Sequence, residues 1–257
     1  MAMPLEIVTI PCLSDNYAFL VHESESGQTA VVDVPEAAPI VAKLNKRNWV
    51  LSEVWLTHHH WDHVDGLPEL LADYPATVVG AKADAYRLPK LDRAVSDGDV
   101  FSFGGEPVHI LDVSGHTIGH IALHLPETAA LFTADSLMPL GCGRLFEGTP
   151  AQMFESLQKT ASMPGNTTVY SGHEYTASNA TFAATVDPEN LALISRLQYI
   201  SDKRKKGLPT VPSSLQLERE TNPFLRAHDP AIQAHLNMAG AAPVDVFTEI
   251  RARKDRF

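Results

Sequence analysis

The octapeptide LTHHHWDH, residues 56–63, places four histidines and one aspartate at the end of an apolar run. In an extended segment residues i and i+2 point to the same side, so His58 and His60 are expected to face the same way. If a helix begins near Asp62, the side chains of Asp62 and His63 lie about 100° apart on its first turn. The stretch therefore predicts two neighbouring pairs of metal ligands.

Each pair needs a further ligand, because a catalytic zinc-like ion is usually held by about three protein ligands and water. Three polar residues qualify, since each directly follows a strand expected to be buried: His116, Asp135 and His173. A carboxylate can also give one oxygen to each of two ions. The pattern predicts a two-metal hydrolytic centre. Its ligands are His58, His60 and His116 for one ion, Asp62, His63 and His173 for the other, and Asp135 shared.

The two cysteines, Cys12 and Cys142, lie outside this ligand set. A structural zinc site is closed and usually rich in cysteine, so the pattern favours a catalytic site. No base is evidently paired with either thiol, and we expect no cysteine nucleophile. The two thiols form no C-x-x-C motif, which indicates a reduced, cytoplasmic protein.

The composition narrows the class of partner. The formal net charge is −11 over 257 residues, which argues against a nucleic-acid-binding protein. No apolar stretch is long enough to cross a membrane. The N-terminal residues 1–6 lack the basic and apolar regions of a signal peptide. We expect a monomer that acts on a small molecule.

Periodicity predicts short strands in the first two-thirds of the chain and helices after Tyr175, where no further strand is expected. The expected strands are 5–10, 17–22, 29–34, 54–57, 77–80, 100–103, 108–113, 121–125, 130–134 and 167–170. The expected helices are 35–48 with Pro35 in its first turn, one around Leu67, one starting at Thr149-Pro150, 179–186, 188–206 capped by Asp187-Pro188, and 244–254. The chain is thus expected to be an α/β domain, 1–174, followed by a helical domain, 175–257.

The metal-ligand motif resembles the signature of the metallo-β-lactamase superfamily, whose fold is an αββα sandwich. Within it, the chain resembles the glyoxalase II (hydroxyacylglutathione hydrolase) family over essentially its full length. The stretches that carry this resemblance are 13–17, 57–63, 114–120, 140–149, 171–176, 222–224 and 251–255. The metal ligands of the family fall on the same seven residues that spacing selects.

The resemblance implies hydrolysis of S-D-lactoylglutathione to D-lactate and glutathione, the second step of methylglyoxal detoxification. It implies two divalent cations, with zinc expected and iron or manganese as alternatives. Two cations sharing one water lower its pKa and hold it as hydroxide near neutral pH. Asp135 is expected to orient this bridging hydroxide for attack on the thioester carbonyl.

The resemblance also implies that residues 1–174 are the catalytic domain and that the helical domain, 175–257, binds substrate. It implies a glutathione-binding set: Arg144, Phe146, Tyr175, Arg251 and Lys254. Arg251 and Lys254 are three residues apart on an expected helix, so they share a face and can meet the glycine carboxylate of the substrate. Many members of the family have a tyrosine where this chain has Phe146. The hydrogen bond of that hydroxyl is therefore absent here.

Four other functions share part of this pattern at the level of the sequence. A lactonase shares the metal ligands but has no use for Arg251 and Lys254. A persulfide dioxygenase of the same superfamily uses one iron and has a shorter C-terminal segment. A metal-buffering module is disfavoured by the open, water-accepting ligand set, and a β-lactamase with a cysteine ligand would need a cysteine in place of Asp135.

Overall fold

The computed structural model describes residues 5–257. Residues 1–4, part of the segment in which we expect no signal peptide, lie outside the described residues. The described chain divides into two compact units. The first comprises the residues up to Asp112 together with Ile118–Thr133, and the second comprises Val113–Thr117 together with Ala134–Phe257. The expected division by function, at residues 174 and 175, stays a prediction.

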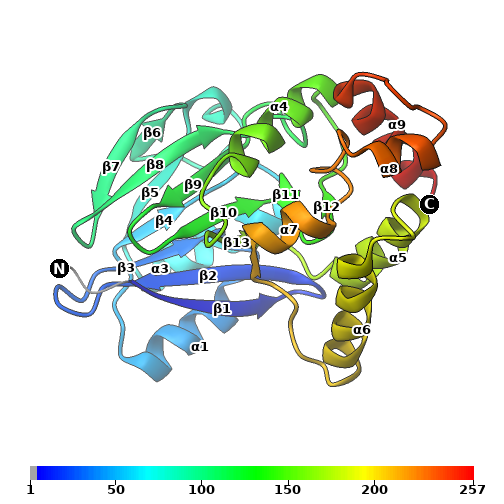
Figure 1. Ribbon diagram of the computed structural model, residues 1–257. Coiled ribbons are helices and arrows are strands. Elements are labelled where there is room, and N and C mark those ends of the chain that lie inside the picture. Colours follow the sequence, from blue (N-terminus) through cyan, green and yellow to red (C-terminus); the bar gives the residue numbers. More distant parts are fainter. Residues whose placement is uncertain (1–4) are drawn as a thin grey trace. The chain divides into compact units, whose positions relative to one another are not determined.

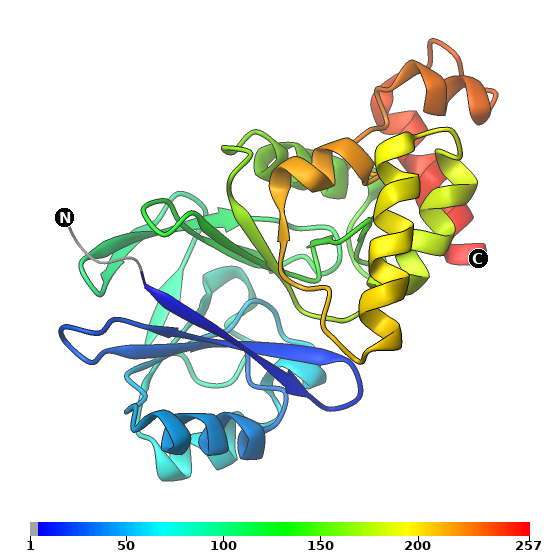
Figure 2. The same ribbon diagram turned by 60° about the horizontal axis from the view of Figure 1, so that its bottom comes forward.

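The first unit contains a mixed sheet in the order β1-β2-β3-β4-β5-β6 (Figure 1). Its strands are β1 (Glu6–Cys12), β2 (Asn16–His22), β3 (Thr29–Val32), β4 (Glu53–Trp55), β5 (Thr77–Ala81) and β6 (Arg93–Val95). The first three strands pair antiparallel and the last four pair parallel. Helices α1 (Ala37–Arg47) and α3 (Leu67–Asp73) cover one face of this sheet, as Figure 2 shows.

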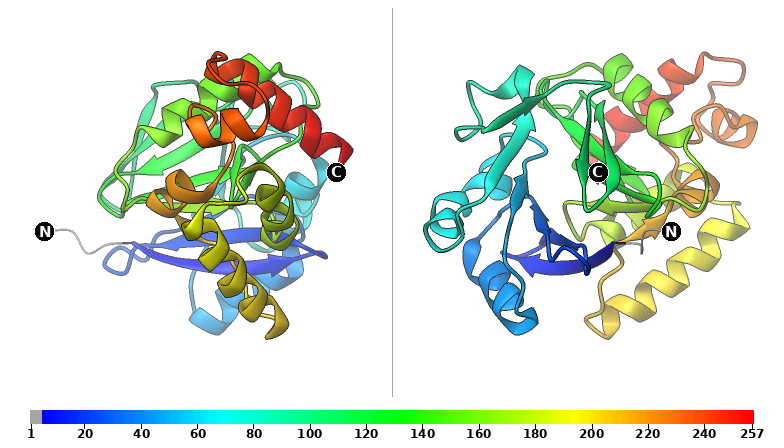
Figure 3. Two further views of the ribbon diagram at one scale, coloured as in Figure 1. Left: turned by 45° about the vertical axis from the view of Figure 1, so that its right-hand side comes forward. Right: turned by 90° about the vertical axis from the view of Figure 1, so that its left-hand side faces the viewer.

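The second sheet has the order β14-β13-β10-β9-β8-β7. Four of its strands pair antiparallel, namely β7 (Val100–Phe103), β8 (Glu106–Asp112), β9 (Ile121–Leu125) and β10 (Ala130–Ala134). They face the first sheet through aromatic pairs: the ring centroids of Phe19 and Phe132 are 5.7 Å apart, and those of Trp55 and Phe103 are 5.0 Å apart. Burial of these rings holds the two layers together. The strands of the two layers can be followed in the right-hand view of Figure 3.

The second unit is mostly helical. Its elements are β11 (Leu137–Met138), β12 (Gly141–Cys142), α4 (Pro150–Ala161), β13 (Thr168–Ser171), α5 (Thr176–Val186), α6 (Leu191–Lys205), β14 (Ser213–Ser214), α7 (Leu215–Thr221), α8 (Pro230–His235) and α9 (Pro243–Arg256). Its core gathers three fully buried rings, with Phe224 in contact with both Phe182 and Phe247. This core ties α5 and α9 to the segment between α7 and α8.

The predicted α/β architecture with a helical C-terminal part is confirmed, but three predicted helix starts are wrong. α5 begins at Thr176, three residues before the predicted start. Pro35 is not in the first turn of α1, which begins at Ala37, because the preceding Val34 pairs through its backbone with the metal-binding segment. Asp187-Pro188 does not cap α6. Instead Asn190 is the N-cap, and its side chain accepts hydrogen bonds from two backbone amides of the first turn.

The expectation that no strand follows Tyr175 is also wrong. The two-residue strand β14 pairs antiparallel with β13 at the edge of the second sheet. A strand of two residues has too little alternation to be recognised in a sequence. It forms because Leu215, just beyond it, donates its amide to the Thr167 carbonyl and extends the pairing.

Candidate metal centre

The metal-ligand segment follows β4 as extended chain and ends in the one-turn helix α2 (Trp61–Val64). His60 is the N-cap of α2, so Asp62 and His63 lie in its first turn. His58 and His63 are fully buried, and His60 and Asp62 are half-buried. The Nε2 of His58 and the Nδ1 of His60 approach to 3.2 Å, as expected for side chains at i and i+2.

A buried aspartate, Asp33, follows β3 and forms hydrogen bonds with this segment. Its Oδ1 accepts the amide of Thr57 at 2.9 Å, and its Oδ2 accepts the Thr57 hydroxyl at 2.8 Å. The same Oδ2 lies 2.8 Å from the Nδ1 of His63. A carboxylate on one ring nitrogen fixes the orientation of a metal-binding histidine and makes its other nitrogen a better ligand. His63 is thus oriented to bind a metal through Nε2.

The other three predicted ligands lie in the second unit. His116 is in the loop after β8, Asp135 follows β10 and His173 follows β13. The Nε2 atoms of His116 and His173 lie 3.5 Å and 3.2 Å from Oδ2 of Asp135. All three side chains are at least nine-tenths buried. One carboxylate therefore stands between two imidazoles, which is the arrangement that a shared ligand requires.

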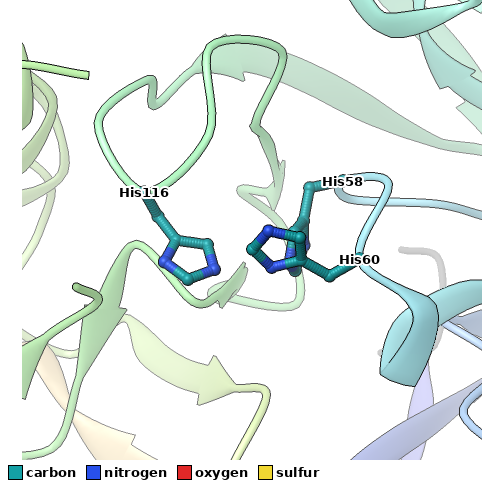
Figure 4. Close-up of side chains that lie close together, drawn as sticks. All are labelled: His58, His60 and His116. Atoms are coloured by element: carbon teal, nitrogen blue, oxygen red, sulfur yellow. The ribbon is translucent and has the colours of Figure 1, made fainter. Parts of the chain in front are cut away.

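The structure brings the predicted ligands together in two groups of three: His58, His60 and His116, and Asp62, His63 and His173. Within each group the ligand atoms lie within 4.8 Å of one another, and Figure 4 shows the rings of the first group turned toward one another. Imidazole nitrogens and carboxylate oxygens suit zinc, iron and manganese. This cluster of histidines and aspartates can bind metal ions, while the identity and number of the ions stay predictions.

Asp33 also forms a group with His58 and His63. Both of its oxygens accept hydrogen bonds from Thr57, so it is better placed to orient His63 than to bind an ion itself. His59 is outside all three groups. Its Nδ1 lies 2.8 Å from the buried carboxylate of Asp84.

Sequence reasoning missed Asp33 and Asn16 as supports of the ligands. The Nδ2 of Asn16 donates to the backbone carbonyl of Asp62 at 2.9 Å and to its Oδ2 at 3.1 Å. Asp33 carried a usable signal, because it is an acidic residue at the end of a buried strand, as Asp135 is. The expected strand 29–34 ran past Asp33 and concealed that signal.

The loop after β12 packs tightly against two of the ligands. The Nδ1 of His116 lies 2.8 Å from the carbonyl oxygen of Arg144, which can accept a hydrogen bond from the Nδ1–H. A Cβ atom at Gly143 would lie 2.0 Å from the carbonyl oxygen of Asp135 and 2.9 Å from the Nδ1 of His116. Only glycine therefore allows this loop to approach both ligands.

We expect Gly143→Ala to displace this loop and to disturb His116. Overpacking costs about 1–3 kcal/mol, and loss of a group that orients a metal ligand costs about 10–100-fold in metal affinity or activity. Metal content after dialysis and turnover should both fall. Gly207→Ala is the control, since its φ of 68° gives backbone strain but no atom lies within 4 Å of the new Cβ. The control should lose stability alone, and unchanged metal content in Gly143→Ala would contradict the packing argument.

Two of the expected substrate-binding residues are exposed aromatic side chains beside the ligands. Tyr175, 40% exposed, stacks on His173 with ring centroids 4.6 Å apart. Phe146, 62% exposed, meets the ring of His116 edge-on at 5.3 Å. Both rings present an apolar surface next to imidazoles, where the non-reacting part of a substrate could rest.

The three expected cations differ in exposure. Arg144 is exposed, and its Nε lies 3.6 Å from Oδ1 of Asp255. Arg251 is buried and donates from Nη2 to the same carboxylate at 2.9 Å. Burial, followed by the charge of Arg251, holds the pKa of Lys254 below its usual range. A bound carboxylate would therefore stabilise the charged form of Lys254 more than it stabilises that of an ordinary surface lysine.

Within residues 5–257, no helix has the length and apolar character needed to span a membrane.

Two family models together match nearly the whole chain. The model of the metallo-beta-lactamase superfamily matches residues 15–173, and that of the hydroxyacylglutathione hydrolase C-terminus matches residues 174–257. The chain is 66% identical to a hydroxyacylglutathione hydrolase of Ruegeria pomeroyi and 62% identical to one of Roseobacter denitrificans. Each comparison runs over 255 residues, which is 99% of this chain and 100% of the relative.

Solved structures agree on the fold. The BLEG-1 B3 metallo-beta-lactamase superposes with a TM-score of 0.67 at 16% identity, covering 86% of this chain and 99% of its own. ETHE1 from Myxococcus xanthus gives 0.66 at 23% identity, covering 97% and 90%. The predicted metallo-β-lactamase fold is confirmed. Together with the full-length identity to named relatives, these matches show that the chain belongs to the hydroxyacylglutathione hydrolase family of the metallo-β-lactamase superfamily.

Proposed function

We propose that this chain hydrolyses S-D-lactoylglutathione to D-lactate and glutathione. The observation that carries the proposal is the pair of three-ligand groups, with Asp135 between His116 and His173. Two sets of nitrogen and oxygen ligands with open positions suit hydrolysis at a two-metal centre. The names of the relatives, which match from end to end, supply the substrate.

We propose zinc as the metal of both groups, with iron or manganese as alternatives. Bound there, two divalent ions would acidify a shared water and polarise the thioester carbonyl. The carboxylate of Asp135 is the group that can orient the attacking water, because its Oδ2 faces His116 and His173 alike. The leaving group is a thiolate with an ordinary pKa of about 8.5, so the reaction needs no dedicated general acid.

The glutathione part of the substrate is proposed to lie over Phe146 and Tyr175, whose exposed rings border the ligands. Arg144, Arg251 and Lys254 supply positive charge for its glycine carboxylate. Lys254 is half-buried, with its Nζ 3.5 Å from the Ser178 carbonyl. These roles rest on the family resemblance together with the positions of the side chains.

A cytoplasmic location is proposed from the state of the thiols. Cys12 and Cys142 are both free and buried. Burial raises the pKa of Cys12 to about 12 and that of Cys142 to about 11, which keeps both protonated and unreactive at neutral pH. The net charge of −11 supports the expected absence of a nucleic-acid partner. The expected monomer stays a prediction.

A substrate panel tests the proposed function. Turnover of the metal-loaded enzyme should be fastest on S-D-lactoylglutathione when it is compared with a lactone, a β-lactam and, by oxygen uptake, glutathione persulfide. Faster turnover on any of the last three would overturn the assignment. Oxygen uptake would point to a dioxygenase, and lactone cleavage would point to a lactonase.

A further inference from the structure

Side chains from the C-terminal helices hold the backbone of residues 138–143, which form the hairpin β11–β12 and its exit. These contacts are buried hydrogen bonds, each between a side chain of the C-terminal helices and a backbone group of the hairpin. They are Asn222 Nδ2 to the Met138 and Gly141 carbonyls at 3.0 Å each, Asn179 Nδ2 to the Pro139 carbonyl at 3.1 Å, and the Leu140 amide to Glu218 Oε2 at 2.8 Å. α5 and α7 with its C-cap thus fix the hairpin.

Arg251 on α9 also binds backbone carbonyls, at the end of the hairpin. Its Nη1 donates to the carbonyl of Cys142 at 3.0 Å and lies 3.5 Å from the carbonyl of Gly143. Its Nη2 donates to Asp255 one turn further along the helix, and its guanidinium lies over the ring of Phe224 at 5.2 Å. The residue is only 6% exposed. The guanidinium is therefore held on three sides by the protein itself.

The segment that Arg251 holds is the one that reaches the ligands. Gly143 packs against the carbonyl of Asp135 and the ring of His116 with no room for a Cβ atom. The next residue, Arg144, places its carbonyl oxygen 2.8 Å from the Nδ1 of His116. Two carbonyls bound by Arg251 thus immediately precede the carbonyl that orients His116.

We propose that Arg251 is a positioning residue for the metal centre: by holding the carbonyls of residues 142 and 143, it sets the Arg144 carbonyl that orients His116. The inference rests on the proposed function, since it takes His116 to be a metal ligand. It assigns to α9 a task besides binding substrate. Arg251 keeps its proposed share, with Lys254 and Arg144, in the positive charge for the substrate carboxylate.

Loss of Arg251 should have different effects on metal binding if the residue only contacts substrate than if it positions a metal ligand. A cation that only meets the glycine carboxylate affects the binding of substrate, so its loss raises KM and leaves metal affinity unchanged. A residue that orients a ligand affects the metal before substrate arrives, and its loss costs about 10–100-fold in metal affinity or activity. Metal affinity of the substrate-free protein therefore separates the two.

The test compares Arg251→Gln with Arg253→Gln in the full-length chain. Arg253 is on the same helix, and its Nε donates to Glu249 at 2.7 Å. Zinc content after dialysis against a chelator, and the visible spectrum of the cobalt-substituted protein, are measured beside kcat and KM. We expect Arg251→Gln to bind metal about 10–100-fold more weakly with a changed cobalt spectrum, and Arg253→Gln to match the wild type. Wild-type metal affinity and spectrum in Arg251→Gln, with only KM raised, would overturn the inference.

Arg251→Lys sharpens the result, because it keeps the charge for substrate but loses the second donor of the guanidinium fork. Its metal affinity should fall between those of the wild type and Arg251→Gln. If Arg251→Gln does not fold, Asp255→Asn is measured instead, since Asp255 is exposed and its carboxylate holds Nη2. A smaller loss of metal affinity is expected there, and none would contradict the inference. Failure of the wild type to cleave the thioester would count against the proposed function and not against this role.

Discussion

Asp62→Ala is expected to abolish nearly all turnover. Asp62 is the carboxylate of its ligand group, with His63 and His173, and the ligand atoms lie within 4.8 Å of one another. Loss of a group that merely orients a ligand costs about 10–100-fold, so loss of a ligand should cost more than about 100-fold. Metal content should fall toward half of the wild-type value, because the other group keeps its three ligands. Turnover of the thioester and metal content per chain are the measurements.

The matched control for this prediction is Asp65→Ala. Asp65 lies just beyond α2, is exposed and belongs to none of the ligand groups. Its removal should leave both measurements at the wild-type level. Near-normal turnover in an Asp62→Ala protein that has lost metal would contradict two-metal chemistry. Full metal content with lost turnover would instead give Asp62 a role in catalysis without metal binding.

Local patterns in the sequence predicted several strands, including the one that leads to Asp135. The strands at Val100–Phe103, Ile121–Leu125 and Ala130–Ala134 have the predicted bounds. The spacing of His58 and His60 also predicted their shared orientation. These features depend on near neighbours in the chain, so a single sequence contains the information that they need.

Features that depend on distant partners were beyond the sequence. Asp187 resembles a helix cap, but its carboxylate binds Arg226, 39 residues away, and the helix starts later. Asp33 lies 30 residues before His63, whose ring it orients. The carbonyl of Arg144 has no side-chain signature at all. The ligands could be predicted because histidine and aspartate are recognisable, whereas the groups that orient them are often backbone atoms or ordinary acids.

The largest effect on stability is expected from Glu218→Gln. Glu218 is fully buried and pairs with Arg196, whose side chain is 4% exposed. Removing one partner of a buried ion pair leaves an uncompensated charge and costs about 3–5 kcal/mol. Glu218 also accepts a hydrogen bond from the amide of Leu140 at 2.8 Å. The substitution therefore weakens the contact between α7 and the β11–β12 hairpin. The free energy of unfolding, measured with denaturant, should fall by that amount.

Glu220→Gln on the same helix is the control, because Glu220 is exposed and its carboxylate accepts a hydrogen bond from the exposed side chain of Gln216 at 2.7 Å. A surface change of this kind is expected within about 0.5 kcal/mol of the wild type. The double variant Arg196→Met/Glu218→Leu separates the cost of the unpaired buried charge from the loss of the hydrogen bond to the hairpin. It should recover much of the lost stability, since apolar replacement of a buried pair is often neutral. Glu218→Gln is also expected to weaken metal binding, because the hairpin leads into the loop that orients His116. The double variant should not recover metal affinity, since it lacks the acceptor for the Leu140 amide. Recovery of both would show that α7 supports the hairpin through packing alone.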